Sequence, residues 1–429
     1  RRRRRHARRL TMATTMTPAS PSATTPTHVG PTDLLARYRP GSSSFFASPG
    51  GQALLGEGVA AVLPAWATGA SRAERVAALL DDAAHSGHPD AVAIGALPFD
   101  EDLPARIVVP AFVRRGPTAQ LTGPAGAVRP ITAGAVSLRP VTSHEGFVAS
   151  VAQAVEELGR GDLRKVVLSR ALQLTASAPI DPATLLRNLI RSEPSAYTFA
   201  IDLPRAVSRA DEGYPARPTR TLLGASPELL LRRRGSRVET SPLAGSAPRH
   251  PDPREDERRG RALAESAKDL GEHAVVVEAI GDALGPLCSE LSVPAQPSLV
   301  RTGTMWHLGT EITGCLRDDL SSLQVALALH PTPAICGTPT GAAREAIARL
   351  EPYRRDFYTG LVGWTDAAGD GEWAVTIRCA HVEESGVRVY AGAGIMADSD
   401  PRSELEETAA KARTLLRAMG IDAEPEFSA

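Results

Sequence analysis

The spacing of apolar residues divides the chain into segments of helical and of extended character. Where apolar residues recur every three or four positions, the pattern predicts a helix with one buried face. The repeat is clear in 143–158, where Ser143 is suited to cap the helix and Gly159 and Gly161 follow its last turn. The same repeat predicts helices over 72–84, 143–158, 181–192, 253–286, with a break near Gly271, and 401–419.

Runs of β-branched and other apolar residues between Gly- and Pro-rich turns predict strands. A Gly235-Ser236 turn separates two of these runs, and the polar stretch 204–220 is expected to be a surface loop. The predicted strands are 91–96, 107–113, 165–174, 197–203, 221–232, 237–242, 373–382 and 387–390. Strands and helices follow one another without a regular βαβ rhythm or a tandem repeat, which favours a large α+β domain over a Rossmann sheet.

Composition narrows the classes of function. The 429 residues are 42% apolar, enough to bury a large core, and 48 Lys and Arg nearly balance 49 Asp and Glu. Proteins that bind nucleic acid or a membrane surface usually carry a positive bias, so we expect neither partner and favour a small metabolite. No run of 18 apolar residues predicts a transmembrane helix. The four cysteines form no CxxC pair, which indicates free thiols in a reducing cytoplasm.

Residues 1–30 differ from the rest of the chain. An arginine-rich block is followed by Thr, Ser and Pro, without the apolar segment of a secretory signal. This composition predicts a disordered tail ahead of a domain that spans 31–425. A basic arm that binds nucleic acid is the alternative.

The helix predicted at 401–419 carries charged residues on one face. Asp400 can cap it, Pro401 suits its first position, and Glu404, Glu407 and Lys411 then fall within two turns of one another. Neighbouring carboxylates repel unless a cation or a proton joins them, and Lys411 can be that cation. Two interpretations stay open: a solvated, salt-bridged helix face and a site for another cation.

A second acidic helix favours the cation site. Glu272 shares a helical stripe with Val275, Val276 and Ala279, where an unpaired carboxylate is unfavourable, so a metal or another partner is required. Magnesium binds one or two carboxylates together with water and ligand oxygens. A pair formed by Glu272 and Glu407 therefore suits magnesium better than zinc, which prefers His and Cys.

Lys165 begins an otherwise apolar strand. Alternation puts it on one side with Val167 and Ser169 and puts Arg170 on the other, so a charge faces inward whichever side is buried. A lysine held in an apolar pocket loses proton affinity and can act as a general base. An edge lysine that extends to solvent is the alternative, and the spacing does not separate the two.

Small residues and one buried cation complete the candidate chemistry. Gly245 and Ser246 follow one predicted strand and Gly392 lies in AGAGI after another, where bare backbone allows a ligand carboxylate to approach closely. Arg378 lies within the predicted strand WAVTIRCA. A guanidinium in that setting usually meets a carboxylate of the ligand or of the protein.

Several long segments between 143 and 419 form an ordered set of motifs. They read GASPELLL, ETSPLAGSAPR, KDLGEHAVVV, MWHLGTEI, LHPTPAICGTPT, FYTGLVGWTDAAGDGEWAVTIRCA and YAGAGIMADSDPRSELEETAAK. In this order they resemble the signature of the chorismate-utilising enzymes, and such a set is far more specific than any single motif. HPTPAICG and GDGEWAVTIR resemble isochorismate synthases, whereas anthranilate, aminodeoxychorismate and salicylate synthases usually have a Ser-Gly-containing segment at 334–337.

The resemblance implies a magnesium-dependent isochorismate synthase, an isomerase that adds water at carbon 2 of chorismate and removes the hydroxyl at carbon 4. Ammonia-using relatives work with a glutaminase, and no such domain is present here, so water is the expected nucleophile and no glutaminase subunit is expected. A monomer in catecholate siderophore or salicylate-type metabolism is implied. The alternatives are a salicylate synthase, a menaquinone-branch isochorismate synthase and a catalytically silent chorismate-binding regulatory protein.

The resemblance also implies roles for individual residues. Lys165 matches the general base that activates water, and Glu228 matches the general acid that protonates the leaving hydroxyl. Glu272 and Glu407 match the magnesium ligands, with Glu404 close by. The positions that match substrate contacts are Gly245, Ser246, His307, Ala334, Arg378, Gly392 and Lys411. The implied fold is one large α+β domain with two packed antiparallel sheets, flanking helices and the site in a cleft between them.

Overall fold

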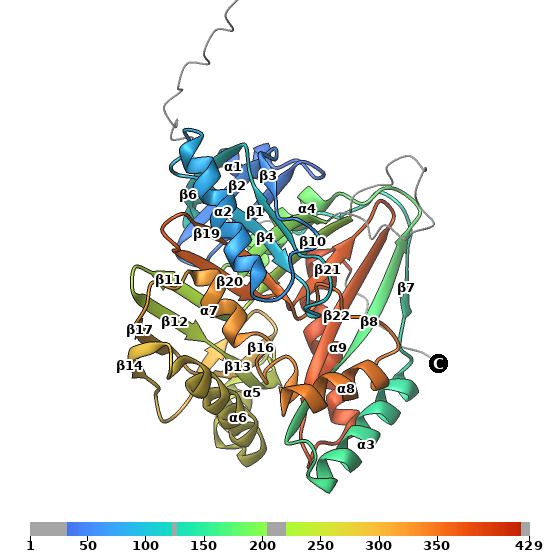
Figure 1. The fold of residues 1–429 in the computed structure, drawn as a ribbon. Coiled ribbons are helices and arrows are strands. Elements are labelled where there is room, and N and C mark those ends of the chain that lie inside the picture. The colour runs from blue at the N-terminus through green and yellow to red at the C-terminus, as the bar shows by residue number, and fades with distance from the viewer. Residues whose placement is uncertain (1–31, 122–126, 204–219, 422–429) are drawn as a thin grey trace, which may run out of the picture.

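The computed structural model describes residues 32–121, 127–203 and 220–421, and two large antiparallel β-sheets dominate it (Figure 1). The first sheet has ten strands. Their order is β18 (Gly337–Thr338), β8 (Lys165–Ala176), β22 (Gly386–Ile395), β21 (Cys379–Val382), β10 (Arg220–Ser226), β9 (Tyr197–Leu203), β1 (Ser43–Ala47), β2 (Gln52–Glu57) and β6 (Phe112–Pro117), with β7 (Val136–Pro140) also paired to β8.

A nine-stranded sheet and a small three-stranded sheet complete the β-structure. The order in the nine-stranded sheet is β14 (Cys288–Ser292), β17 (Ile312–Leu316), β12 (Arg237–Ser241), β11 (Leu229–Arg234), β20 (Gly371–Val375), β19 (Leu361–Asp366), β4 (Val92–Leu97), β5 (Arg106–Val109) and β3 (Ala61–Val62). The order in the small sheet is β13 (Leu243–Pro248), β16 (Met305–Gly309) and β15 (Ser298–Arg301).

Helices cover the outer sides of the sheets (Figure 1). They are α1 (Thr32–Arg37), α2 (Ser71–His85), α3 (His144–Arg160), α4 (Pro182–Ser192), α5 (Pro253–Glu265), α6 (Ala267–Leu284), α7 (Ser322–Leu329), α8 (Thr340–Leu350) and α9 (Pro401–Ala418), with a 3₁₀ turn at Thr118–Gln120. Helices α3, α4, α8 and α9 pack on the ten-stranded sheet, α2 and α7 on the nine-stranded sheet, and α5 and α6 on the small sheet.

Apolar side chains fill the space between the two large sheets. Phe46 and Phe199 from the first sheet meet Ile94 and Val362 from the second in one buried cluster. Three further clusters lie beneath the outer helices, one under α4 and α9, one under α2, α6 and α7, and one under α3 and α8. Each large sheet therefore buries apolar residues on both faces, which confirms the predicted α+β architecture of two packed antiparallel sheets flanked by helices.

The predicted helices are present, but the break within 253–286 was predicted at the wrong residue. Ser143, Asp181 and Asp400 cap α3, α4 and α9 by accepting backbone N–H groups. The break predicted near Gly271 instead lies at Ser266, which has an extended backbone and accepts the Asp269 N–H as the N-cap of α6. A capping hydroxyl thus decides the boundary, because glycine inside a helix weakens it without ending it.

Two long predicted strands, 221–232 and 373–382, are wrong in an informative way. Each is a pair of strands that belong to different sheets: β10 continues into β11, and β20 into β21. The first link contains Pro227, which cannot donate to a sheet ladder. The second contains Arg378, whose φ is +48°. The chain therefore crosses between the two large sheets at 227–228 and again at 376–378.

Proline and glycine also explain two smaller differences between the predicted and the observed elements. The predicted strand 107–113 is divided by Pro110 into β5 and β6, which lie in different sheets. Helix α3 continues through Gly159 and ends at Gly161, whose left-handed backbone forms the C-cap. The tail 1–30 and nearly all of the predicted loop 204–220 lie outside the described residues.

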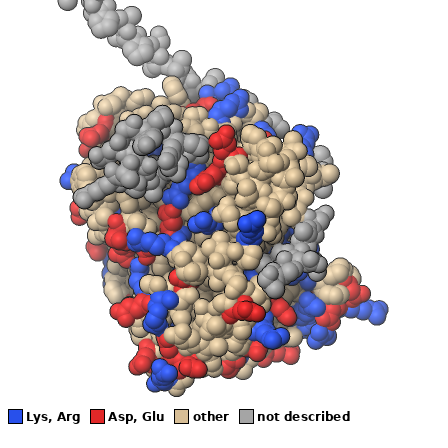
Figure 2. Space-filling view, turned by 90° about the vertical axis from the view of Figure 1, so that its right-hand side faces the viewer, with Lys and Arg blue, Asp and Glu red and all other residues tan. Residues whose placement is uncertain are grey.

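The described surface is mixed in charge. Figure 2 shows one face of the molecule, on which basic and acidic side chains are interspersed. Among the helices of the described ranges, none combines the length and the apolar character needed to cross a membrane.

Candidate active site

A cavity opens where the two large sheets meet the paired strands β13 and β16. Both links between the sheets contribute to the wall, together with β8, β22, α6 and α9. The wall includes these predicted site residues: Glu228, Gly245, Ser246, Glu272, His307, Ala334, Arg378, Gly392, Glu407 and Lys411. Of the remaining two, Lys165 lies behind Glu272, and Glu404 lies one turn before Glu407 on α9.

Lys165 at the start of β8 is fully buried, which excludes the edge-lysine alternative. Its Nζ lies 2.9 Å from Oε1 of Glu272 on α6. Gly394 of β22 leaves room for this ion pair, because a Cβ there would clash with Glu272 and lie 3.0 Å from Lys165 Cε. The lysine is therefore not isolated in an apolar pocket as its strand pattern predicted, since the carboxylate from a distant helix is its partner.

Glu228 occupies the first link between the sheets. Its backbone N–H donates to Ser226 Oγ at 3.2 Å, and its side chain is only 2% exposed. Burial raises the pKa of Glu228 to about 7, although a hydrogen bond from the Leu243 backbone and the charges of Lys165 and Arg378 act in the opposite direction. A large fraction of this carboxyl group is therefore protonated at neutral pH, as a general acid requires.

Helices α6 and α9 bring carboxylates and lysines together. Lys268 Nζ lies 2.7 Å from Glu404 Oε1, and Lys411 Nζ lies 2.5 Å from Glu407 Oε1, which also accepts a 2.9 Å hydrogen bond from Ser246. Glu404 is 2% exposed, so this face of α9 is not solvated, although Lys411 does pair with Glu407 as the salt-bridge interpretation predicted. Burial, reinforced by Glu407, raises the pKa of Glu404. Burial acts the same way on Glu407, but Lys411 and Ser246 outweigh it and lower the pKa of Glu407.

The same cluster has donor groups that fit magnesium. Asp269, Glu272, Glu404 and Glu407 all interact electrostatically with Lys268, and oxygen donors are those that magnesium prefers. In the part of the chain that the structure describes, no three His, Cys, Asp or Glu side chains are placed close enough together to form a metal site. The chemistry of the donors thus fits the ion, while the carboxylates as placed are joined to lysines.

Arg378 lies in the second link between the sheets and not inside a strand. Its φ of +48° turns the chain at this point, and its Nη2 lies 3.4 Å from Nε2 of His307 on β16. Burial, followed by the positive charge of Arg378, lowers the pKa of His307 well below 6.5. The imidazole is therefore neutral at physiological pH and adds no second positive charge beside the guanidinium.

Two glycines allow close packing at the wall. Gly245 has a φ of +77°, and a Cβ there would lie 3.0 Å from Cβ of Asp269. Gly392 leaves room for Tyr358, whose hydroxyl oxygen would lie 2.8 Å from a Cβ added at Gly392. The carbonyl of Gly392 accepts a 3.0 Å hydrogen bond from Lys411 Nζ. Both positions fit the sequence argument that bare backbone is needed here.

The wall residues that sequence reasoning did not name as site residues include Ile335, Tyr358, Thr359 and Tyr390. The rings of Tyr358 and Tyr390 stack with their centroids 4.9 Å apart and their planes 12° apart. Tyr358 belongs to the motif FYTG, which was a usable signal. A motif does not tell which way its aromatic side chain points, however.

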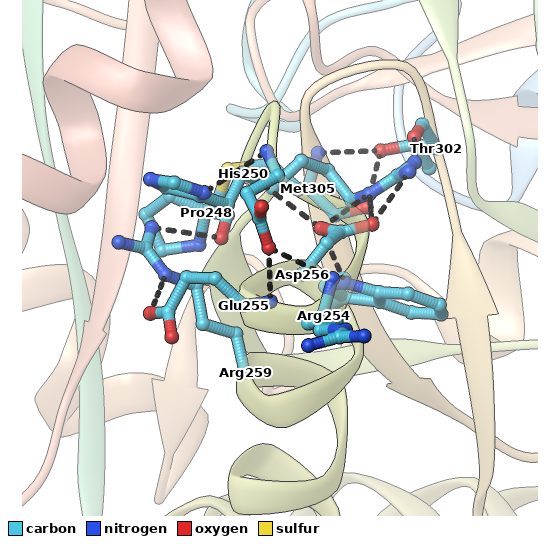
Figure 3. A network of polar contacts seen from close by, with 11 residues as sticks. Pro248, His250, Arg254, Glu255, Asp256, Arg259, Thr302 and Met305 are labelled. Carbon is cyan, nitrogen blue, oxygen red and sulfur yellow. Dashed lines mark hydrogen bonds and ion pairs between the residues drawn. The ribbon is translucent and has the colours of Figure 1, made fainter.

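The strand pair β13–β16 is fixed from outside by Asp256 of α5 (Figure 3). The two carboxylate oxygens accept hydrogen bonds from Arg249 Nε at 2.9 and 2.8 Å, and Oδ1 also accepts from the His250 N–H at 2.9 Å and Trp306 Nε1 at 3.0 Å. The hydrogen bonds from Arg249 hold the pKa of Asp256 well below its usual range. Because Trp306 precedes His307 in β16, one carboxylate joins the end of β13 to the strand that carries His307.

Comparisons with known proteins agree with this geometry. A family model described as "Chorismate binding enzyme" matches residues 126–420. The isochorismate synthase DhbC of Bacillus subtilis is 49% identical over 395 residues, which cover 91% of this chain and 96% of that protein. The isochorismate synthase EntC of Escherichia coli K12 is 40% identical over 352 residues, which cover 81% and 86% of the two chains.

A solved structure shares the fold. The crystal structure described as the putative 2,3-dihydroxybenzoate-specific isochorismate synthase DhbC of Bacillus anthracis has a TM-score of 0.83 and 45% identity, and the match covers 91% of this chain and 99% of that one. Family model, relatives and structure all point in the same direction. The chain belongs to the chorismate-binding enzyme family and is an isochorismate synthase, an isomerase.

Proposed function

We propose that this isochorismate synthase uses Lys165 as general base and Glu228 as general acid in a magnesium-dependent exchange of hydroxyl groups on chorismate. The observation that carries the proposal is a buried lysine, joined to Glu272 of the cavity wall, together with a glutamic acid of the same wall whose pKa burial raises to about 7. Displacement of a poor leaving group needs a proton acceptor for the nucleophile and a proton donor for the hydroxyl that departs.

The proposed reaction balances in atoms and charge. Lys165 Nζ, in its neutral form, accepts a proton from water as the water oxygen bonds to carbon 2. The ring double bond shifts, and the bond between carbon 4 and its hydroxyl oxygen breaks as Glu228 donates its proton to that oxygen. One water enters and one water leaves. Return of a proton from Lys165 to Glu228 through solvent restores the enzyme.

Positive charge and bare backbone suit the two carboxylates of chorismate. Arg378 offers a guanidinium to one carboxylate, and neutral His307 stands beside it. On strand β13, Gly245 offers open backbone and Ser246 offers a hydroxyl to the cavity. The walls at Ala334 and Gly392 carry no bulky side chain, and Lys411 lies between Gly392 and Glu407.

Glu272 and Glu407 would hold magnesium, with Glu404 close by. When bound, the ion supplies positive charge for the ring carboxylate of the substrate. The support is the chemistry of the donors on α6 and α9.

Incubation of the purified protein with chorismate and magnesium tests the reaction. We expect isochorismate without release of pyruvate, and no amino product with ammonium salts. Lys165→Ala should lower kcat by about 10²–10⁴-fold. Arg164→Ala, which changes the neighbouring exposed residue, is the control and should keep wild-type turnover. Release of pyruvate would identify a salicylate synthase, binding without turnover a silent chorismate-binding protein, and an active Lys165→Ala variant would exclude the proposed base.

We further propose that the product serves catecholate siderophore synthesis and that the enzyme acts in the cytoplasm as a monomer without a glutaminase subunit. The support for the pathway is that relatives include the vibriobactin-specific isochorismate synthase of Vibrio cholerae, 40% identical over 381 residues. A strain without this gene should stop growing under iron limitation and recover with 2,3-dihydroxybenzoate. Recovery with menaquinone instead would assign the product to the other branch.

A further inference from the structure

Arg355 lies outside the cavity wall, yet it joins three segments of that wall. It follows α8 and is fully buried, with its side chain 1% exposed. Nη1 donates to the Ile335 carbonyl at 2.8 Å and to Thr359 Oγ1 at 3.3 Å, and Nη2 donates to the Val167 carbonyl at 2.7 Å. All three partners line the cavity. They come from the segment before β18, from the turn before β19 and from β8, which are far apart in the sequence.

Glu351 completes the arrangement. Its two oxygens accept from Arg355 Nη2 at 2.6 Å and from Nε at 2.9 Å. With these two bonds and the three above, each of the five N–H donors of the guanidinium has a partner. Glu351 Oε1 also accepts from the backbone N–H of Ser169 at 2.7 Å and from its hydroxyl at 2.8 Å. The pair thus holds β8 at 167 and at 169, on the same strand that begins with Lys165.

We propose that Arg355, held by Glu351, is a positioning residue that fixes the turn at 359 against the Lys165 strand and against the segment at 335, which continues into the strand paired with it. A planar guanidinium can bridge several acceptors at fixed angles, which a lysine ammonium on a flexible stem cannot do. The pair touches neither the substrate cavity nor the reacting groups. Its effect on catalysis therefore passes through backbone position, where an error of about 1 Å can lower a rate by about a hundredfold.

Arg355→Lys is the test, because it keeps the positive charge beside Glu351 and removes the bridge. We expect kcat to fall about 10–100-fold at a temperature where the variant is folded. Arg233→Lys is the matched control. Arg233 is also buried and bonded to Asp370 and to the Ala368 carbonyl, but it lies on the nine-stranded sheet and is not part of the wall. The control should have a lowered Tm and an unchanged kcat.

A second variant separates positioning from stability. Glu351→Gln combined with Arg355→Met leaves no buried charge unpaired, so its Tm should exceed that of Arg355→Met alone. Its kcat should stay low, because the carbonyls at 167 and 335 are still not bridged. Wild-type kcat in this double variant, or in folded Arg355→Lys, would overturn the proposal and leave the pair as a structural element only. The inference rests on chorismate turnover by the wild-type enzyme, which is measured first, so absence of that activity would contradict the function and not the positioning role.

Discussion

Protonation of Glu228 is the residue-level property on which activity should depend most directly. Its pKa of about 7 reflects a fully buried carboxyl group whose charged form is disfavoured by burial. The acid form is required for catalysis, so kcat/KM for chorismate should fall about tenfold per pH unit above pH 7. Initial rates from pH 6 to 9 measure this. A profile that stays flat to pH 9 would contradict the assignment of Glu228 as general acid.

The same burial predicts a trade between stability and activity. The Glu228 carboxyl has a pKa near 4.5 in the unfolded chain and about 7 in the folded one. Its contribution to the free energy of unfolding is therefore fully present below pH 4.5 and is lost as pH rises to about 7, a loss on the order of 3 kcal/mol. Glu228→Gln has no such loss. Its Tm relative to the wild type should rise between pH 5 and pH 7 and then level off, while turnover falls about 10²–10⁴-fold. An equal Tm for both proteins at pH 5 and pH 8 would argue against the raised pKa.

At the scale of elements, α6 and α9 matter because their carboxylates share one cluster, in which Lys268 of α6 pairs with Glu404 of α9. If they hold magnesium together, Glu407→Gln should weaken binding of the ion at least about tenfold, since a charged oxygen ligand is lost. Isothermal titration with magnesium, or titration with manganese followed by electron paramagnetic resonance, measures this without turnover. Glu406→Gln changes the exposed neighbour on α9 and should bind like the wild type. Equal affinity in both variants would remove Glu407 from the metal site.

The strand pair β13–β16 depends on a different helix, α5. Asp256→Asn removes the charge that accepts hydrogen bonds from Arg249, His250 and Trp306. We expect a lower Tm and a KM for chorismate raised several-fold with kcat little changed, because this strand pair contributes to binding more than to proton transfer. Glu255→Gln on the same helix is the control. Glu255 pairs with Arg258 and Arg259 near the surface, where such ion pairs contribute little. A KM that changes equally in both variants would indicate a general effect of α5.

Elements that the sequence predicted well are those specified by local chemistry. Helices α3, α4 and α9 have an apolar stripe and a capping side chain within a few residues, so periodicity and caps predict them. Helices α1, α7 and α8 were not predicted, and neither were many of the strands, among them β1, β2, β7 and β14 to β19. Alternation along a strand is also the same whether the next strand joins the same sheet or another one, so 221–232 and 373–382 were each read as one strand.

For the site, the sequence predicted the residues and the local pair of Glu407 with Lys411, but not the partners that come from other elements. Glu272 was expected to need a cation, and the magnesium interpretation followed from residue type alone. The lysine that the structure places beside it begins a strand in another part of the chain, and no short-range pattern connects the two. Lys268, beside Glu404, was not considered for the same reason. Long-range pairing is decided by how the sheets and helices pack, which a single sequence does not contain in readable form.

For the whole molecule, the site residues and the matched family region both fall within 126–420. Removal of residues 1–30 should therefore leave kcat and KM for chorismate unchanged. The comparison with the full chain should include retention on double-stranded DNA at low and high salt. Salt-sensitive retention that disappears on removal would support the basic-arm alternative. A loss of chorismate turnover would show that the first 30 residues contribute to the site.

The two links between the large sheets, at 227–228 and 376–378, carry Glu228 and Arg378. Their length is constrained by the strands that follow them. Side chains alternate between the two faces of a strand, so one residue added or removed in a link would shift the register of the next strand by one residue. Every inward side chain of β11 or β21 would then face outward. These links should therefore accept no insertion or deletion, even though surface turns of similar length usually do.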